Sequence, residues 1–172
     1  MPGRAVRWCW RGFLCVALLV GCAKLAEQSA AVDDTPVREK FAQLQAAIKG
    51  RDADKLWALL DSRSRADAER AAKAIRAAYA KATADEKAAQ EKALGLLGKE
   101  LAGLTGKGFL RTNRFHVKYR EVSDSSVQQV VVEGDSATVY YLEEDGDKEK
   151  AILVRQDGEW KVWLTMPKTG KP

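Results

Sequence analysis

Few side chains in this 172-residue chain are of the types that act as nucleophiles or bind transition metals. There are three cysteines, Cys9, Cys15 and Cys22, and one histidine, His116. Zinc sites of the Cys/His type need several such ligands together, and the cysteines all lie within the first 22 residues, far from His116 in the chain. We therefore expect no metal site and no cofactor. A Cys–His or Ser–His–Asp site is excluded unless His116 is its single base.

Acid–base catalysis without histidine would need a buried carboxylate opposite an acidic hydroxyl group. Tyr119 and Tyr141 could supply the hydroxyl, but aspartates and glutamates gather in predicted turns and on predicted helix surfaces. We therefore predict a protein that is not an enzyme.

The N-terminal segment has the three parts of a secretory signal. It opens with three basic and no acidic residues, Arg4, Arg7 and Arg11. Residues 12 to 20 are apolar, and Gly21 precedes Cys22. This apolar run is shorter than the roughly 20 residues that a membrane-spanning helix needs. We expect residues 1 to 21 to be removed as a signal peptide.

The end of this segment, Leu19-Val20-Gly21-Cys22, resembles the lipobox of bacterial lipoproteins. In that family the cysteine thiol receives a diacylglyceryl group and the signal is cut before it. Two or more acyl chains anchor a protein stably, at about 0.8 kcal/mol per buried methylene. The resemblance implies lipidation of Cys22 and a membrane partner. Ala23 after the cysteine implies a place in the cell envelope at the outer membrane, facing the periplasm.

Removal of the signal leaves a chain long enough for one domain. The signal takes three of the 29 basic residues and none of the 24 acidic ones, so 26 basic and 24 acidic residues remain, a net charge of +2. This balance gives nucleic-acid binding little support, and we expect no nucleic-acid partner. We divide the remainder into a flexible tether (22–34), a folded domain (35–166) and a C-terminal tail (167–172).

The first half of the domain is predicted to be helical. Thr35-Pro36 predicts a helix start capped by Thr35, Gly50 ends that helix, and Asp52 caps a short second one. Residues 65 to 94 are rich in alanine, the strongest helix former, and Thr83 to Glu86 form a capping box within them.

The pattern then becomes alternating, which predicts strands. Phe115, Val117 and Tyr119 alternate with polar residues, so we predict a strand here with His116 facing solvent. Four further strands, joined by glycine-containing turns, are predicted at 127–132, 136–142, 151–156 and 159–165. Helices followed by a meander predict an α+β fold, with N-terminal helices packed on an antiparallel sheet.

Two segments of the meander carry a family resemblance, Val132-Glu-Gly-Asp-Ser-Ala-Thr-Val139 and Leu153-Val-Arg-Gln-Asp-Gly-Glu-Trp-Lys-Val162. With the lipoprotein signal and the preceding helices, they resemble the nuclear-transport-factor-two-like (NTF2-like, or cystatin-like) superfamily, in particular its uncharacterised bacterial lipoproteins. The resemblance implies a curved sheet wrapped around helices as a cone, which often holds a pocket. Members include enzymes and non-catalytic binders, so the fold alone does not choose a function.

Three hypotheses follow. The first is a protein-interaction domain, binding a second copy or an envelope partner through an apolar sheet face; its interface candidates are Tyr140, Leu142, Leu153 and Trp163. The second is a small-molecule binder using the cone; its pocket candidates are Trp57, Tyr119, Tyr141 and Trp160. The third is an enzyme. The basic run from Arg111 to Arg120 has two interpretations, an anion-binding face or the solvated side of an edge strand.

Overall fold

The computed structural model describes residues 33–168, and within this range all helices precede the strands. The expected signal peptide, Cys22, most of the tether and the end of the tail lie outside the described residues. The helices are α1 (Thr35–Lys49), α2 (Ala53–Leu59), α3 (Ser62–Lys81), α4 (Ala84–Leu94), α5 (Gly98–Ala102), α6 (Gly106–Phe109), α7 (Asn113–Tyr119) and the 3-10 helix η1 (Arg120–Asp124). The strands are β1 (Ser126–Glu133), β2 (Ser136–Leu142), β3 (Lys148–Gln156) and β4 (Glu159–Trp163).

The four strands form one antiparallel sheet in the order β1-β2-β3-β4, so every strand pairs with its neighbour along the chain. The α+β class and the meander predicted from the sequence are confirmed. The boundaries differ slightly, since β3 begins at Lys148 and β4 ends at Trp163. Asp157 and Gly158, between β3 and β4, both have positive φ, as the two-residue hairpin turn predicted from Asp-Gly requires.

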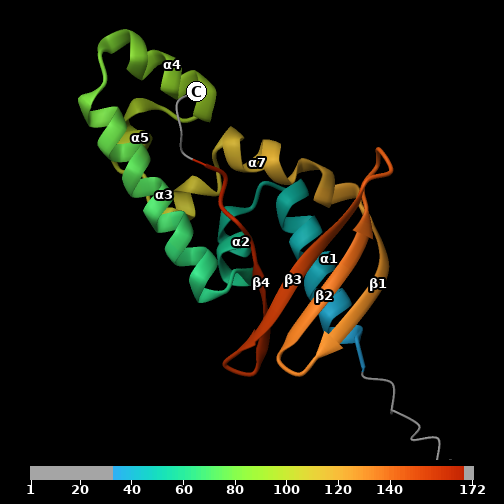
Figure 1. The fold of residues 1–172 in the computed structure, drawn as a ribbon. Coiled ribbons are helices and arrows are strands. Elements are labelled where there is room, and N and C mark those ends of the chain that lie inside the picture. The colour runs from blue at the N-terminus through green and yellow to red at the C-terminus, as the bar shows by residue number, and fades with distance from the viewer. Residues whose placement is uncertain (1–32, 169–172) are drawn as a thin grey trace, which may run out of the picture. The chain divides into compact units, whose positions relative to one another are not determined.

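Helix α1 covers one face of the sheet, as Figure 1 shows. The side chains between the two fill the space, and the ring of Phe41 on α1 lies 5.3 Å from the ring of Tyr141 on β2. Fully buried side chains come from both layers: Val37, Phe41 and Leu44 from α1, and Val139, Leu153 and Val162 from the sheet. Burying each such side chain contributes about 1.5–3 kcal/mol, so this helix–sheet contact is a main source of stability.

The two edges of the sheet differ. Strand β4 is covered by the start of α3: the amide of Asp61 donates to the carbonyl of Val162 (3.0 Å), and the amide of Leu164 donates to the hydroxyl of Ser64 (2.8 Å). Among residues 33–168 no strand pairs with the free edge of β1. Asp61 is buried, whereas the sequence placed the acidic residues in turns and on helix surfaces. Its side chain accepts from the amide of Ser64 and caps α3.

Most predicted helix ends are confirmed. Asp52 caps α2 through the amide of Lys55, and Thr83 and Glu86 form the capping box of α4. The first cap was predicted one residue too late: the N-cap of α1 is Asp34, and Thr35 is already helical. Helix boundaries shift this easily because a helix start is defined by backbone geometry rather than by one side chain.

The strand predicted around Phe115 is wrong, because residues 113–119 form α7. Thr112 caps this helix by accepting from the amide of Phe115. Phe115 and Tyr119, four residues apart, therefore share the buried face, while Val117 between them is 72% exposed. His116, predicted to face solvent, is 94% buried, with 6% of its surface exposed.

Candidate functional site

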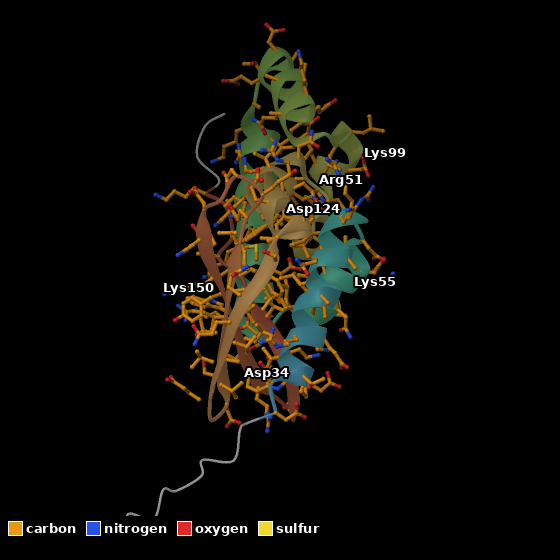
Figure 2. The ribbon with its side chains drawn as sticks, turned by 90° about the vertical axis from the view of Figure 1, so that its right-hand side faces the viewer. Asp34, Arg51, Lys55, Lys99, Asp124 and Lys150 are labelled. Carbon is orange, nitrogen blue, oxygen red and sulfur yellow. The ribbon has the colours of Figure 1, made fainter. Side chains whose placement is uncertain are left out.

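Three of the four interface candidates lie on the face of the sheet opposite α1, called the outer face below. Figure 2 shows α1 on one side of the sheet and Lys150 on the other. Tyr140 pairs directly with Lys150 and Leu142 with Lys148, so these four side chains share the outer face. Tyr140 is 43% exposed, and Trp163 is half-buried beneath the guanidinium of Arg63, 5.2 Å from its ring.

Leu153 was placed on the wrong face. It pairs with Ala137 on β2 and Val162 on β4, both core residues, and it has no exposed surface. Ile152 and Val154, its neighbours on β3, take the outer face instead, because side chains alternate along a strand. Leu153 is therefore a core residue and is not available to a partner.

The four pocket candidates are core or core-packed residues rather than the walls of one cavity. Tyr119, Tyr141 and Trp160 are buried, and Trp57 packs against the core with Arg65 5.6 Å from its ring. The hydroxyl of Tyr119 donates to the carbonyl of Thr165, and burial raises the pKa of this phenol. Burial likewise raises the pKa of Tyr141 to about 12. Both phenols therefore stay protonated at neutral pH.

A polar pocket that the sequence did not predict lies between the end of α1 and α7. This α1–α7 pocket has a volume of about 430 Å³, within the usual range for small-ligand sites. Asn113, His116, Val117 and Arg120 line it from one side; their spacing of three, four and seven residues is that of one helix face. The opposite side comes from Ile48, Lys49 and Arg51, and Ser123 completes the lining.

His116 is the most unusual of these residues. Its Nε2 atom is buried and has no hydrogen-bond partner among residues 33–168. A backbone hydrogen bond with Leu110 acts in the direction of a higher pKa for this ring. The pKa of His116 is lowered, first by burial and then by the positive charge of Arg51. The ring is therefore mostly neutral at pH 7, in a pocket that contains three cationic side chains.

Arg51 occupies a backbone position that normally favours glycine. The amides of Arg51 and Asp52 donate to the carbonyls of Ile48 and Ala47, which is the hydrogen-bond pattern of a Schellman motif at the end of α1. In that motif the residue after the C-cap is left-handed and is usually Gly. Here Gly50 is the right-handed C-cap, and Arg51 takes the left-handed position with φ of 51°.

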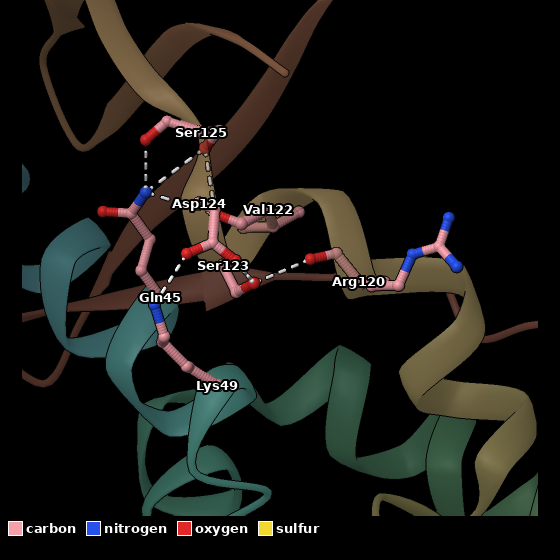
Figure 3. Close-up of polar contacts among 7 residues, drawn as sticks. All are labelled: Gln45, Lys49, Arg120, Val122, Ser123, Asp124 and Ser125. Atoms are coloured by element: carbon pink, nitrogen blue, oxygen red, sulfur yellow. Dashed lines mark hydrogen bonds and ion pairs between the residues drawn. The ribbon is translucent and has the colours of Figure 1, made fainter. Parts of the chain in front are cut away.

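The wall beside the pocket is a network of polar contacts, which Figure 3 shows. The amide of Gln45 on α1 donates to the carbonyls of Val122 and Ser125, at 3.1 and 2.7 Å. Lys49 pairs with Asp124 at 2.7 Å, and this hydrogen-bonded pair raises the pKa of Lys49 and lowers that of Asp124. These contacts hold the end of α1 against η1, so the two sides of the pocket are fixed relative to each other.

The basic run from Arg111 to Arg120 does not form a single anion-binding face. Arg111 pairs with Glu100 at 3.3 Å and Arg120 with Glu121 at 2.6 Å. Arg114 and Lys118 donate to the backbone carbonyls of Lys168 and Thr165. The edge-strand interpretation fails too, since no residue of the run lies in a strand: Arg111 lies in a turn, and residues 113–120 are helical. Of its four cations, only Arg120 lines the α1–α7 pocket.

A sequence signal for this pocket does exist. Phe115, Tyr119 and Val122 are spaced four and three residues apart, which fits a helix as well as Phe115, Val117 and Tyr119 fit a strand. The helical spacing would have placed His116 and Arg120 on one face. No comparable signal points to Arg51, which meets α7 only through the tertiary fold.

Comparisons with known proteins add little. No protein-family model and no curated protein matches the chain. One solved structure, described as a "Putative NTF2-like transpeptidase" from Campylobacter jejuni, is similar over 74% of this chain and 98% of its own, at 12% identity and a TM-score of 0.33. Residues 33–168 contain no helix long and apolar enough to span a membrane, and no group of three or more His, Cys, Asp or Glu placed to hold a metal ion.

Proposed function

We propose that the chain is a lipid-anchored protein of the bacterial cell envelope that binds another protein through the outer face of its sheet, without catalysing a reaction. The anchoring part rests on the sequence of residues 1–22, and the binding part on the outer face. The single observation that carries the binding part is Tyr140, a large aromatic side chain that is 43% exposed on the outer face of the sheet, beside Leu142 on its own strand.

The surroundings of Tyr140 indicate the chemistry of the partner. A surface hollow of about 530 Å³ opens beside Tyr140, and its charged lining residues are Lys148, Lys150 and one acid, Glu149. Neither lysine has a carboxylate partner among residues 33–168. A partner that presents apolar side chains beside Asp or Glu would bury the tyrosine and neutralise both lysines. A second copy of this chain would instead bring its own lysines to the same face.

Site-specific photo-crosslinking tests the face in the full chain in a bacterial envelope. We expect a photoreactive phenylalanine at position 140 to give an adduct heavier than the monomer by the mass of a partner. The same group at Leu97, which is 61% exposed on another part of the surface, controls for random collision. Lys148→Glu combined with Lys150→Glu should remove the adduct, whereas Lys99→Glu should not.

Three outcomes would overturn this assignment. They are no adduct at position 140, an equal adduct at position 97, or an adduct of twice the chain mass, which identifies a second copy as the occupant. Anchoring is tested separately with an alkyne-labelled fatty acid. We expect the wild-type chain to carry the label and Cys22→Ser to lack it; equal labelling of both would refute lipidation at this cysteine.

A further inference from the structure

We propose that the free edge of β1 pairs with β1 of a second copy of this chain, in antiparallel orientation and about a two-fold axis that passes through Val131. Such pairing joins the two four-stranded sheets into one continuous sheet. The inference does not rest on the proposed function, because the edge of β1 and the outer face are different surfaces, and the pairing leaves both outer faces free.

The two edges of the sheet are protected unequally. Strand β4 has the start of α3 beside it, where Leu60 forms a parallel bridge to Val162. Strand β1 lies at the opposite edge, as Figure 1 shows, and no strand among residues 33–168 pairs with it there. Natural edge strands are guarded by lysines, prolines or bulges. Residues 126–132 contain no charged residue and no proline, so this part of β1 lacks the first two protections.

The core layer is incomplete at the same edge. Val130 and Val132 on β1 pair with Val139 and Ala137 on β2, and those two β2 residues are almost fully buried. The two valines of β1 pack against the same core but are only partly buried. A further strand beside β1 would cover them with its own side chains. Removing apolar surface from water favours association, so the edge suits a strand that brings apolar side chains.

The regular part of β1 fixes the centre of the pairing. The register between β1 and β2 shifts just before Gln129, so the uninterrupted stretch is residues 129–133, and Val131 is its middle residue. Directly opposite side chains of an antiparallel pair lie on the same face. With the axis at Val131, core-face residues meet core-face residues, and Val130 lies opposite Val132 of the second copy.

The charges of this stretch also suit a second copy. Glu133, the one charged residue of β1, lies opposite Gln129 of the second copy, whose amide can donate to the carboxylate. On the outer face Val131 lies opposite its own equivalent. Like charges directly opposite each other destabilise a pair of strands, and none meet in this register. The stretch is therefore complementary to itself, as a two-fold interface requires.

A cysteine at the axis tests this pairing in the full chain in a bacterial envelope. Val131→Cys places two thiols opposite each other, because paired Cα atoms of antiparallel strands lie about 4.5–5.5 Å apart, within the range of a disulfide. After mild oxidation we expect a species of twice the chain mass that a reductant removes. The wild type, which has the same Cys9, Cys15 and Cys22, should give none.

Gln129→Cys is the matched control, on the same strand and the same face. Gln129 is more exposed than Val131, so random collision would oxidise its cysteine at least as readily. In the proposed register the two copies of residue 129 lie four residues apart along the strands, about 14 Å, too far for a disulfide. Absence of the Val131→Cys dimer, or an equal dimer from Gln129→Cys or from the wild type, would overturn the proposal.

Two lysine variants test the dimer without trapping it. Val131→Lys puts like charges opposite each other at the axis. It should make the detergent-solubilised full chain monomeric in native mass spectrometry, whereas the wild type should be dimeric. Gln128→Lys, placed at the register shift and away from the axis, should remain dimeric. A monomeric wild type, or a dimer that survives in Val131→Lys, would overturn the pairing.

A last variant separates the edge from the outer face. Lys148→Glu combined with Lys150→Glu changes the outer face and should leave the disulfide of Val131→Cys unchanged. This result would support the edge pairing whether or not the outer face binds a partner. Loss of the disulfide in this background would place the second copy on the outer face and overturn the edge pairing.

Discussion

Replacing Arg51 by glycine should make the folded domain more stable. A left-handed backbone costs a residue with a Cβ atom roughly 1–2 kcal/mol, and Arg51 has φ of 51° at the end of α1. Glycine has no such cost, but it makes the unfolded chain more flexible, which costs about 0.4–1 kcal/mol. Subtracting the second cost from the first leaves a net gain of about 0–1.6 kcal/mol. Arg51 has no ion pair with a carboxylate among residues 33–168, so its replacement breaks none.

Urea unfolding followed by circular dichroism at pH 7.5 measures this change in the free energy of unfolding. A matched control is Lys55→Gly, which removes an exposed cation from α2, where the backbone is right-handed. That control should lose about 0.5–1 kcal/mol, because glycine is a poor helix former. Loss of stability in Arg51→Gly would refute the reasoning, since the side chain would then contribute more than its backbone conformation costs.

Three further changes have defined expectations. Leu153→Ala should lower the free energy of unfolding by about 2–5 kcal/mol, because it leaves a cavity at a fully buried position. A loss below about 1 kcal/mol would contradict the placement of Leu153 in the core. Because the pKa of His116 is lowered in the folded state, the unfolded chain binds its proton more readily, so stability should fall as pH drops through about 6.5, the unfolded value. The urea midpoint of the wild type should thus be lower at pH 5.5 than at pH 7.5, and His116→Gln should reduce that difference rather than preserve it. Gly95→Ala should lower the melting temperature and disturb the amide signals of Asn113, because Gly95 has φ of 69° and its Cβ would clash with that side chain; unchanged melting would contradict the close approach.

The sequence by itself determined the class of the fold and most of its elements. The capping residues Asp52 and Thr83 were identifiable because a cap is made by side chains a few residues apart. The meander was identifiable because alternation and short glycine turns are also local features. The face of Leu153 could also have been predicted from the sequence. A two-residue turn at Asp157-Gly158 pairs Gln156 with Glu159, and the same register pairs Leu153 with the core residue Val162.

Tertiary structure alone decided two other features. The apolar residues of segment 113–119 fit the spacing of a helix as well as that of a strand. In the helix that forms, Phe115 and Tyr119 are both buried while Val117 is exposed. The α1–α7 pocket joins Arg51 to His116, 65 positions later in the chain. No local pattern reports such a pairing, because packing of the helices, rather than spacing along the chain, brings these two residues to one pocket.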